Sequence, residues 1–369
     1  MRKLVLLLSL ATLPLLAQDE TVVLKLPGMD KVEVKKDLRF DATHTFDLYR
    51  PHGITAAVPV VIFLNGVGRP DLKEWGQYTS WPRLVATRGI AAVTHQSEGN
   101  DAGPQVDALL RYLREHAGEL KIDPSRIAIW ACSANGRVGT ELAAKADNLR
   151  AAVFYYSAMN TAPKNVNLPV FVARAGLDAL SLNQGIDRWV AQAVAIDAPV
   201  TLVTYPEGRH GFELLDDTPE SRLIVTQTLD FLQHHLTTAP TPRKEPMTLS
   251  QLQTLLATGI DPVIARLTEL RKTNPKAYVL QEESLNSLGY VLLDDKVADG
   301  VKILELVATM YPDSPNAHDS LGDAYEAAGR KEDAVREAER ALALLENARP
   351  PRREAIRRSA EDKLKRLKQ

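Results

Sequence analysis

The sequence predicts an α/β domain, with a mostly parallel sheet covered by helices on both faces, followed by an all-α region. Three observations predict this class. Apolar runs rich in Val and Ile alternate with amphipathic stretches over residues 18–236. A proline-containing segment, residues 237–247, then ends that alternation. Only helical periodicity continues through residues 248–369.

Length and composition limit the functional classes. A chain of 369 residues is long enough for about two domains. Its 45 basic and 47 acidic side chains argue against a nucleic-acid binder, which needs a basic face. One cysteine excludes an internal disulfide and any cysteine-clustered metal site. We expect no metal and no organic cofactor.

Residues 1–17 have the layout of a secretory signal peptide. A basic start precedes the apolar run Leu4–Leu16, and Ala17 stands before polar residues. The run is shorter than the roughly 20 residues that a membrane-spanning helix needs. We therefore expect an exported bacterial protein, periplasmic or extracellular, with no transmembrane segment in the mature chain. A buried N-terminal helix is the alternative.

The strands are expected where apolar or alternating runs lie between turn residues. Val58–Leu64 is continuously apolar, as is typical of a strand covered on both faces of a sheet. In order, the expected strands are Val22–Leu26, Lys31–Lys35, Thr45–Tyr49, Val58–Leu64, Ile90–Thr94, Ile127–Ala131, Ala151–Tyr156, Val170–Arg174 and Val200–Thr204.

Helical spacing of apolar residues separates several of these strands. It recurs from Val106 to Leu113 and from Ile186 to Ala193. A third helix is expected to begin after Thr218, with Pro219 in its first turn, and to run to Leu236.

The C-terminal part contains a short internal repeat. Leu288-Gly289-Tyr290 recurs as Leu321-Gly322-Asp323, and small residues follow at Ala334, Ala338 and Ala341. This pattern resembles a tetratricopeptide repeat, with a weaker helix pair at residues 248–274. The resemblance implies binding of a protein partner or self-association. The alternative is a short helical appendage that packs on the first domain or dimerises.

A serine stands where a buried strand gives way to a helical pattern. Ser133 follows the strand Ile127–Ala131, and helical spacing begins at Val138. Small residues beside a serine at a sharp strand-to-helix turn let the two backbones approach, as in the pattern G-x-S-x-G. Here Ala131 and Asn135 replace the two glycines. A serine that merely caps the next helix is the alternative.

Two further residues follow later strands in the order of a catalytic triad. Asp178 follows the strand from Val170, and His210 follows the strand from Val200. The order Ser, Asp, His is that of the α/β-hydrolase fold. Among other residues, His95 also stands at a strand end, and Asp187 lies within a predicted helix.

The negative charge of an acyl-transfer intermediate needs backbone N–H donors. One is expected from Ala134, the residue after the nucleophile. The other is expected from the loop that follows Val58–Leu64, with Val67 preferred over Gly66.

With these residues, the segment from about residue 40 to residue 236 resembles the dienelactone-hydrolase-like branch of the α/β-hydrolase superfamily. The namesake enzymes use a cysteine where this chain has Ser133, so their lactone substrate does not transfer. Cys132 is adjacent, but neighbouring strand residues point to opposite faces, and a buried structural thiol is expected there. The matching segments are Phe63-Leu-Asn-Gly-Val-Gly68, Asp123-Pro-Ser-Arg-Ile-Ala-Ile-Trp-Ala-Cys-Ser133, Val172-Ala-Arg-Ala-Gly-Leu-Asp178 and Pro206-Glu-Gly-Arg-His210-Gly-Phe.

The sequence thus predicts an exported serine hydrolase that cleaves an ester-type bond of a small molecule through an acyl-enzyme. Two alternatives remain. One is a catalytically degenerate hydrolase scaffold that serves as an interaction module through its helical repeats. The other is a small serine peptidase.

Overall fold

The computed structural model describes residues 19–65, 71–96, 102–145, 148–240, 245–348 and 350–368. The expected signal peptide and the expected oxyanion-hole residues Gly66 and Val67 lie outside these ranges. The chain divides into two compact units, Met1–Pro242 and Arg243–Gln369. None of the described helices is both long and apolar enough to cross a membrane.

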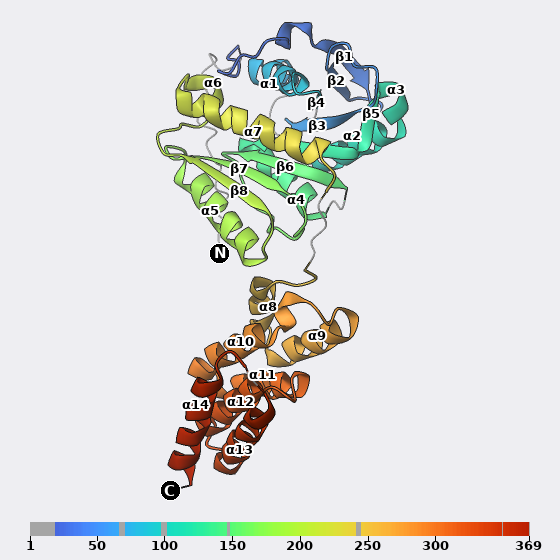
Figure 1. Ribbon diagram of the computed structural model, residues 1–369. Coiled ribbons are helices and arrows are strands. Elements are labelled where there is room, and N and C mark those ends of the chain that lie inside the picture. Colours follow the sequence, from blue (N-terminus) through green and yellow to red (C-terminus); the bar gives the residue numbers. More distant parts are fainter. Residues whose placement is uncertain are drawn as a thin grey trace, which may run out of the picture. The chain divides into compact units, whose positions relative to one another are not determined.

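The first unit is built on one eight-stranded sheet with the order β1-β2-β4-β3-β5-β6-β7-β8 (Figure 1). β2 pairs antiparallel with β1 and β4, and all pairs from β4 to β8 are parallel. The predicted α/β-hydrolase fold class is confirmed. The strands are β1 Glu33–Arg39, β2 Thr45–Arg50, β3 Val58–Leu64, β4 Ala91–His95, β5 Ile122–Cys132, β6 Leu149–Tyr155, β7 Val170–Ala175 and β8 Val200–Tyr205.

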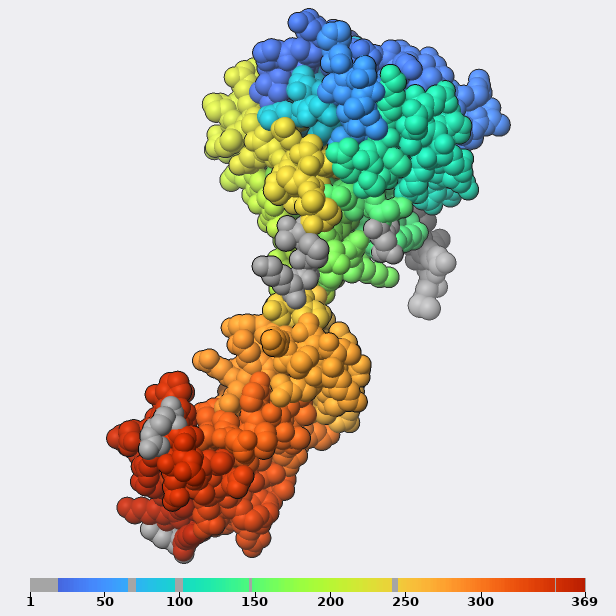
Figure 2. Space-filling model, turned by 45° about the vertical axis from the view of Figure 1, so that its right-hand side comes forward, coloured from blue at the N-terminus to red at the C-terminus, as the bar shows by residue number. Residues whose placement is uncertain are grey.

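Helices cover both faces of this sheet because its strands carry apolar residues on both sides. Leu109, Leu142 and Ile186 pack from α2, α4 and α5 on one face, and Trp81 and Leu229 pack from α1 and α7 on the other. In the space-filling view α7, in yellow, forms part of the outer surface of the unit (Figure 2). The helices are η2 Met29–Lys31, η3 Leu72–Glu74, α1 Gly76–Ala86, α2 Ala102–Glu115, α3 Ala117–Leu120, η4 Ser133–Asn135, α4 Gly136–Lys145, α5 Leu180–Ala195, α6 Phe212–Leu215 and α7 Pro219–Thr237.

Two expectations near the N-terminus are wrong. The segment Val22–Leu26 forms no strand, and the strand expected at Lys31–Lys35 begins two residues later, after the short helix η2. The Val22 N–H donates to Ser80 Oγ at 3.0 Å, and the Val23 N–H donates to the Glu213 carbonyl at 2.8 Å. The segment is therefore held by residues of α1 and α6, which its own composition does not reveal.

The second unit is all-α, as predicted. Small residues allow close helix packing within it, since a Cβ at Gly289 would lie 2.6 Å from Leu304 of α11. Gly322 occupies the matching place in α12, where a Cβ would lie 2.9 Å from Lys363 Nζ. Ala334, Ala338 and Ala341 of α13 are fully buried. The helices are α8 Leu249–Leu256, α9 Ile260–Thr273, η5 Tyr278–Leu280, α10 Glu282–Asp295, α11 Val297–Met310, α12 Pro315–Ala327, α13 Lys331–Asn347 and α14 Arg353–Leu367.

Candidate active site

Ser133 lies at a sharp turn between a buried strand and a helix. β5 ends at Cys132, Ser133 opens the short helix η4, and α4 begins at Gly136. Ser133 has a φ of 51°, in the left-handed region that non-glycine residues rarely occupy. Backbone strain of this kind is held in place by surrounding structure and is frequent at functional sites. The turn therefore has the conformation expected for a serine nucleophile.

At this turn the residue that lies in close contact with the neighbouring backbone is Gly136, not Asn135. A Cβ at Gly136 would lie 2.5 Å from Ser157 Cβ, which no real side chain tolerates. Asn135, by contrast, is accommodated as a buried residue of η4. The glycine that the motif needs is thus displaced by one position, and the departure at Asn135 does not prevent the turn.

Asp178 and His210 are in direct contact. His210 Nδ1 lies 2.7 Å from Asp178 Oδ2, and the side chains are 29% and 5% exposed. The other carboxylate oxygen, Oδ1, accepts the Ala179 N–H at 2.6 Å. Two backbone bonds join the loops that carry the pair: Gly176 N–H to the Tyr205 carbonyl and Leu177 N–H to the Gly208 carbonyl. Protonation at Nδ1 leaves the imidazole Nε2 available as a base.

The three residues follow strands of the parallel run β5-β6-β7-β8. Ser133 follows β5, Asp178 follows β7 and His210 follows β8, so all lie at the carboxyl edge of parallel strands. Between them, the Ala158 N–H after β6 donates to the Ser133 carbonyl at 2.8 Å. Ser133 Oγ makes no hydrogen bond to another described residue, so the structure joins only the acid and the histidine directly. Catalytic hydrogen bonds are often long before substrate binds.

Cys132 is buried beside α1. Its Sγ lies 3.3 Å from the Tyr78 hydroxyl, and burial raises the thiol pKa to about 12. A thiol is nucleophilic only as the thiolate, so Cys132 is poorly suited to attack a carbonyl at neutral pH.

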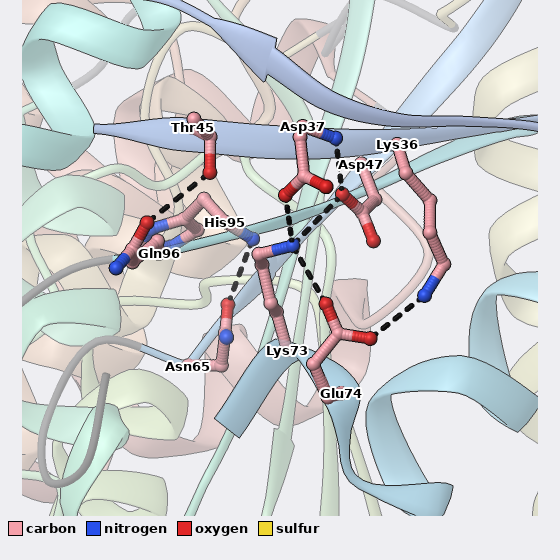
Figure 3. Close-up of polar contacts among 9 residues, drawn as sticks. All are labelled: Lys36, Asp37, Thr45, Asp47, Asn65, Lys73, Glu74, His95 and Gln96. Atoms are coloured by element: carbon pink, nitrogen blue, oxygen red, sulfur yellow. Dashed lines mark hydrogen bonds and ion pairs between the residues drawn. The ribbon is translucent and has the colours of Figure 1, made fainter. Parts of the chain in front are cut away.

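Of the expected oxyanion-hole donors, only Ala134 lies among the described residues, within η4 directly after Ser133. The loop expected to supply the second donor leaves the sheet at Asn65. Asn65 is buried, and its side-chain oxygen accepts the His95 N–H at 3.1 Å, which ties the ends of β3 and β4 together (Figure 3).

His95 and Asp187, the alternative histidine and acid, lie in environments unlike those of His210 and Asp178. His95 is fully buried, and this burial lowers its pKa to about 4, so it is a neutral core residue. Asp187 lies on α5 and forms an ion pair with Arg174 at 2.8 Å. The described residues contain no group of three or more His, Cys, Asp or Glu side chains placed to hold a metal ion.

A buried polar group that the sequence did not indicate contacts Tyr156, whose ring lies against His210. Glu213, three residues after the histidine, is fully buried and bonds to Tyr156 and Gln77. The available signal was a single acidic residue between Phe212 and Leu214, within an otherwise apolar turn.

Comparisons with known proteins give structural neighbours only. No family model and no curated protein matches the chain. A fungal esterase from Rhizomucor miehei is similar at 15% identity and a TM-score of 0.47, over 56% of this chain and 84% of that one. Esterase 2 of Thermogutta terrifontis is similar at 17% identity and a TM-score of 0.46, over 58% and 98%. A mutant of the esterase rPPE is similar at 17% identity and a TM-score of 0.48, over 58% and 86%.

Proposed function

We propose that this protein is a serine hydrolase of ester-type bonds, with Ser133 as nucleophile, His210 as general base and Asp178 as the orienting acid. The observation that carries the proposal is the 2.7 Å bond between Asp178 and His210 at the sheet edge where Ser133 has a left-handed backbone. A serine nucleophile needs a base, and the base needs an orienting partner.

In the proposed reaction, Ser133 Oγ attacks the acyl carbon while His210 Nε2 takes the hydroxyl proton. The Ala134 N–H and the start of α4 stabilise the negative oxygen of the intermediate. The imidazolium then returns its proton to the departing alcohol, which leaves an acyl-Ser133 ester. Water, deprotonated by His210, releases the acid and restores the serine.

Wild-type protein tests this proposal directly. We expect it to hydrolyse short p-nitrophenyl esters and to become covalently labelled by a fluorophosphonate, because the serine can act as a nucleophile. Turnover measured by absorbance and labelling measured by mass spectrometry check both results. If folded protein shows neither ester turnover nor labelling, the result favours the alternative of a degenerate hydrolase scaffold that acts through its helical unit.

We also propose that the protein is exported. The basic start, the apolar run Leu4–Leu16 and Ala17 support cleavage before Gln18 and a location outside the cytoplasm. We expect the intact mass of the native protein to correspond to a chain that begins at or near Gln18. A native chain that retains residues 1–17 in a cytoplasmic fraction would contradict this expectation.

A further inference from the structure

We propose that Glu213 is a second acidic positioning residue of this site, which holds His210 through Tyr156 and stabilises the imidazolium that forms during acylation. This inference rests on the proposed function for its catalytic consequence. Its central claim, that Glu213 favours the protonated form of His210, can be tested without any substrate.

The first step is the set of contacts that hold Glu213. One oxygen, Oε1, accepts hydrogen bonds from the Tyr156 hydroxyl at 2.6 Å and from Gln77 Nε2 at 2.9 Å. The second oxygen, Oε2, is buried and has no hydrogen-bond partner among the described residues. The backbone carbonyl of Glu213 accepts the Val23 N–H at 2.8 Å. An acid held at both its backbone and its side chain has a defined orientation.

The second step leads from Glu213 to the histidine. The Tyr156 ring lies directly against His210, with ring centroids 4.4 Å apart. Tyr156 follows β6, and its φ of 36° is unusual for a bulky residue. From this backbone conformation, the Tyr156 ring contacts His210 and its hydroxyl donates a hydrogen bond to Glu213. Tyr156 therefore contacts both the acid and the imidazole ring.

The third step is electrostatic. Burial raises the pKa of Glu213, while the hydrogen bonds from Tyr156 and Gln77 and a positive His210 act in the opposite direction. The interaction of two charges is reciprocal, so an ionised Glu213 must also favour the positive form of His210. Glu213 is fully buried and His210 is 29% exposed, so solvent screens part of this interaction.

The other titratable groups around this pair are neutral or already assigned. Tyr78 contributes a hydroxyl from α1 and Cys132 a thiol from β5, and burial raises the pKa of each. Burial also raises the pKa of Tyr156. On its other side His210 faces Asp178. Among these described groups, Glu213 and Asp178 are the two carboxylic acids that contact Tyr156 or His210.

The experiment measures the pH at which His210 takes up its proton, by NMR of the full chain labelled with 15N-histidine. The eight histidines are resolved by assigning His210 from a His210→Ala variant. Glu213→Gln keeps the shape and an oxygen acceptor but removes the charge. We expect this variant to move the His210 midpoint down by about one pH unit, at the lower end of what an opposite charge does. The acidic limb of kcat/KM should move equally, and kcat/KM should fall about tenfold.

Two tyrosine variants make the result specific. Tyr156→Phe removes the shortest hydrogen bond to Glu213 and should move the midpoint in the same direction by a smaller amount. Tyr155→Phe is the matched control, because it also removes a buried hydroxyl bond, 2.6 Å long, but to Thr228. It should leave the midpoint unchanged.

The outcomes separate the two proposals. An unchanged midpoint in folded Glu213→Gln, or an equal shift in Tyr155→Phe, would overturn the role of Glu213. If Glu213→Gln does not fold, the His210 midpoints of the two tyrosine variants are compared instead. A shift in Tyr156→Phe that is absent from Tyr155→Phe supports the role of Glu213, and equal midpoints overturn it. If wild type turns over no ester, the proposed function fails while the NMR titration still tests the electrostatic claim.

Discussion

Ser133→Ala should abolish fluorophosphonate labelling and lower ester turnover by at least about 10⁴-fold, because the proposed acyl-enzyme forms on this residue. His210→Ala should be nearly as severe, since members of a triad act as a unit and their losses do not add. Asp178→Asn should also reduce turnover strongly, because it allows the wrong tautomer of the imidazole at the 2.7 Å contact. Steady-state kinetics and intact mass after labelling measure these effects.

Cys132→Ala is the matched control for the proposed nucleophile Ser133. The thiol is adjacent in sequence, but it is buried, and its pKa of about 12 keeps it protonated. We expect this variant to label normally and to lose roughly 1–2 kcal/mol of stability. If Cys132→Ala were inactive while Ser133→Ala still labelled, the nucleophile would be the thiol and the proposed assignment would be wrong.

Lys73→Met should destabilise the first unit by about 3–5 kcal/mol, because it leaves a buried carboxylate without its cation. Lys73 Nζ lies 2.8 Å from Asp37, 2.8 Å from Glu74 and 3.1 Å from the fully buried Asp47 (Figure 3). Asp47 Oδ1 also accepts the Asp37 N–H at 2.9 Å, while Asp47 Oδ2 has no hydrogen-bond partner among the described residues. The charge of Asp47 is therefore compensated chiefly by this one lysine.

The stability that Lys73 contributes depends on pH, because the lysine must be protonated to pair with the carboxylates. Burial acts to lower the lysine pKa, but the three carboxylates outweigh it and raise the value above the usual 10.5. Since the folded value lies above the unfolded one, the part of the contribution that depends on the lysine proton is complete below pH 10.5 and is lost as pH rises beyond it, and the pairing also requires that the carboxylates stay ionised. The stability difference between wild type and Lys73→Met should therefore be fully present at pH 7.

Urea unfolding followed by tryptophan fluorescence measures this effect selectively. All four tryptophans lie in the first unit, at positions 75, 81, 130 and 189. Lys36→Met is the control, because Lys36 also binds Glu74, at 2.7 Å, but its side chain is 52% exposed. We expect this control to change stability by no more than about 0.5 kcal/mol. Equal losses in the two lysine variants would contradict a special role for the buried charge.

All eight strands of the sheet were predicted from the sequence in their correct order, together with one segment, Val22–Leu26, that forms no strand. Continuous apolar runs such as Val58–Leu64 identify strands covered on both faces, and the structure buries every residue of that strand. Because the carboxyl ends of parallel strands share one edge, positions after those runs place Ser133, Asp178 and His210 at the same edge of the sheet. Asp178 and His210 do meet, at 2.7 Å. This much is readable because it depends on local periodicity and on a general property of parallel sheets.

Which polar residues are buried, and which partners they have, depends on contacts between distant parts of the folded chain. Glu213 contacts Gln77 and Tyr156, and Lys73 contacts Asp47, in each case across many intervening residues. The segment from Val22 bonds to Ser80 and Glu213 instead of to a neighbouring strand, and so reads wrongly as a strand. An acidic or basic side chain has the same local signature whether it faces solvent or a distant partner. Burial of a charge depends on the pairing that compensates it, and that pairing exists only once the chain has folded.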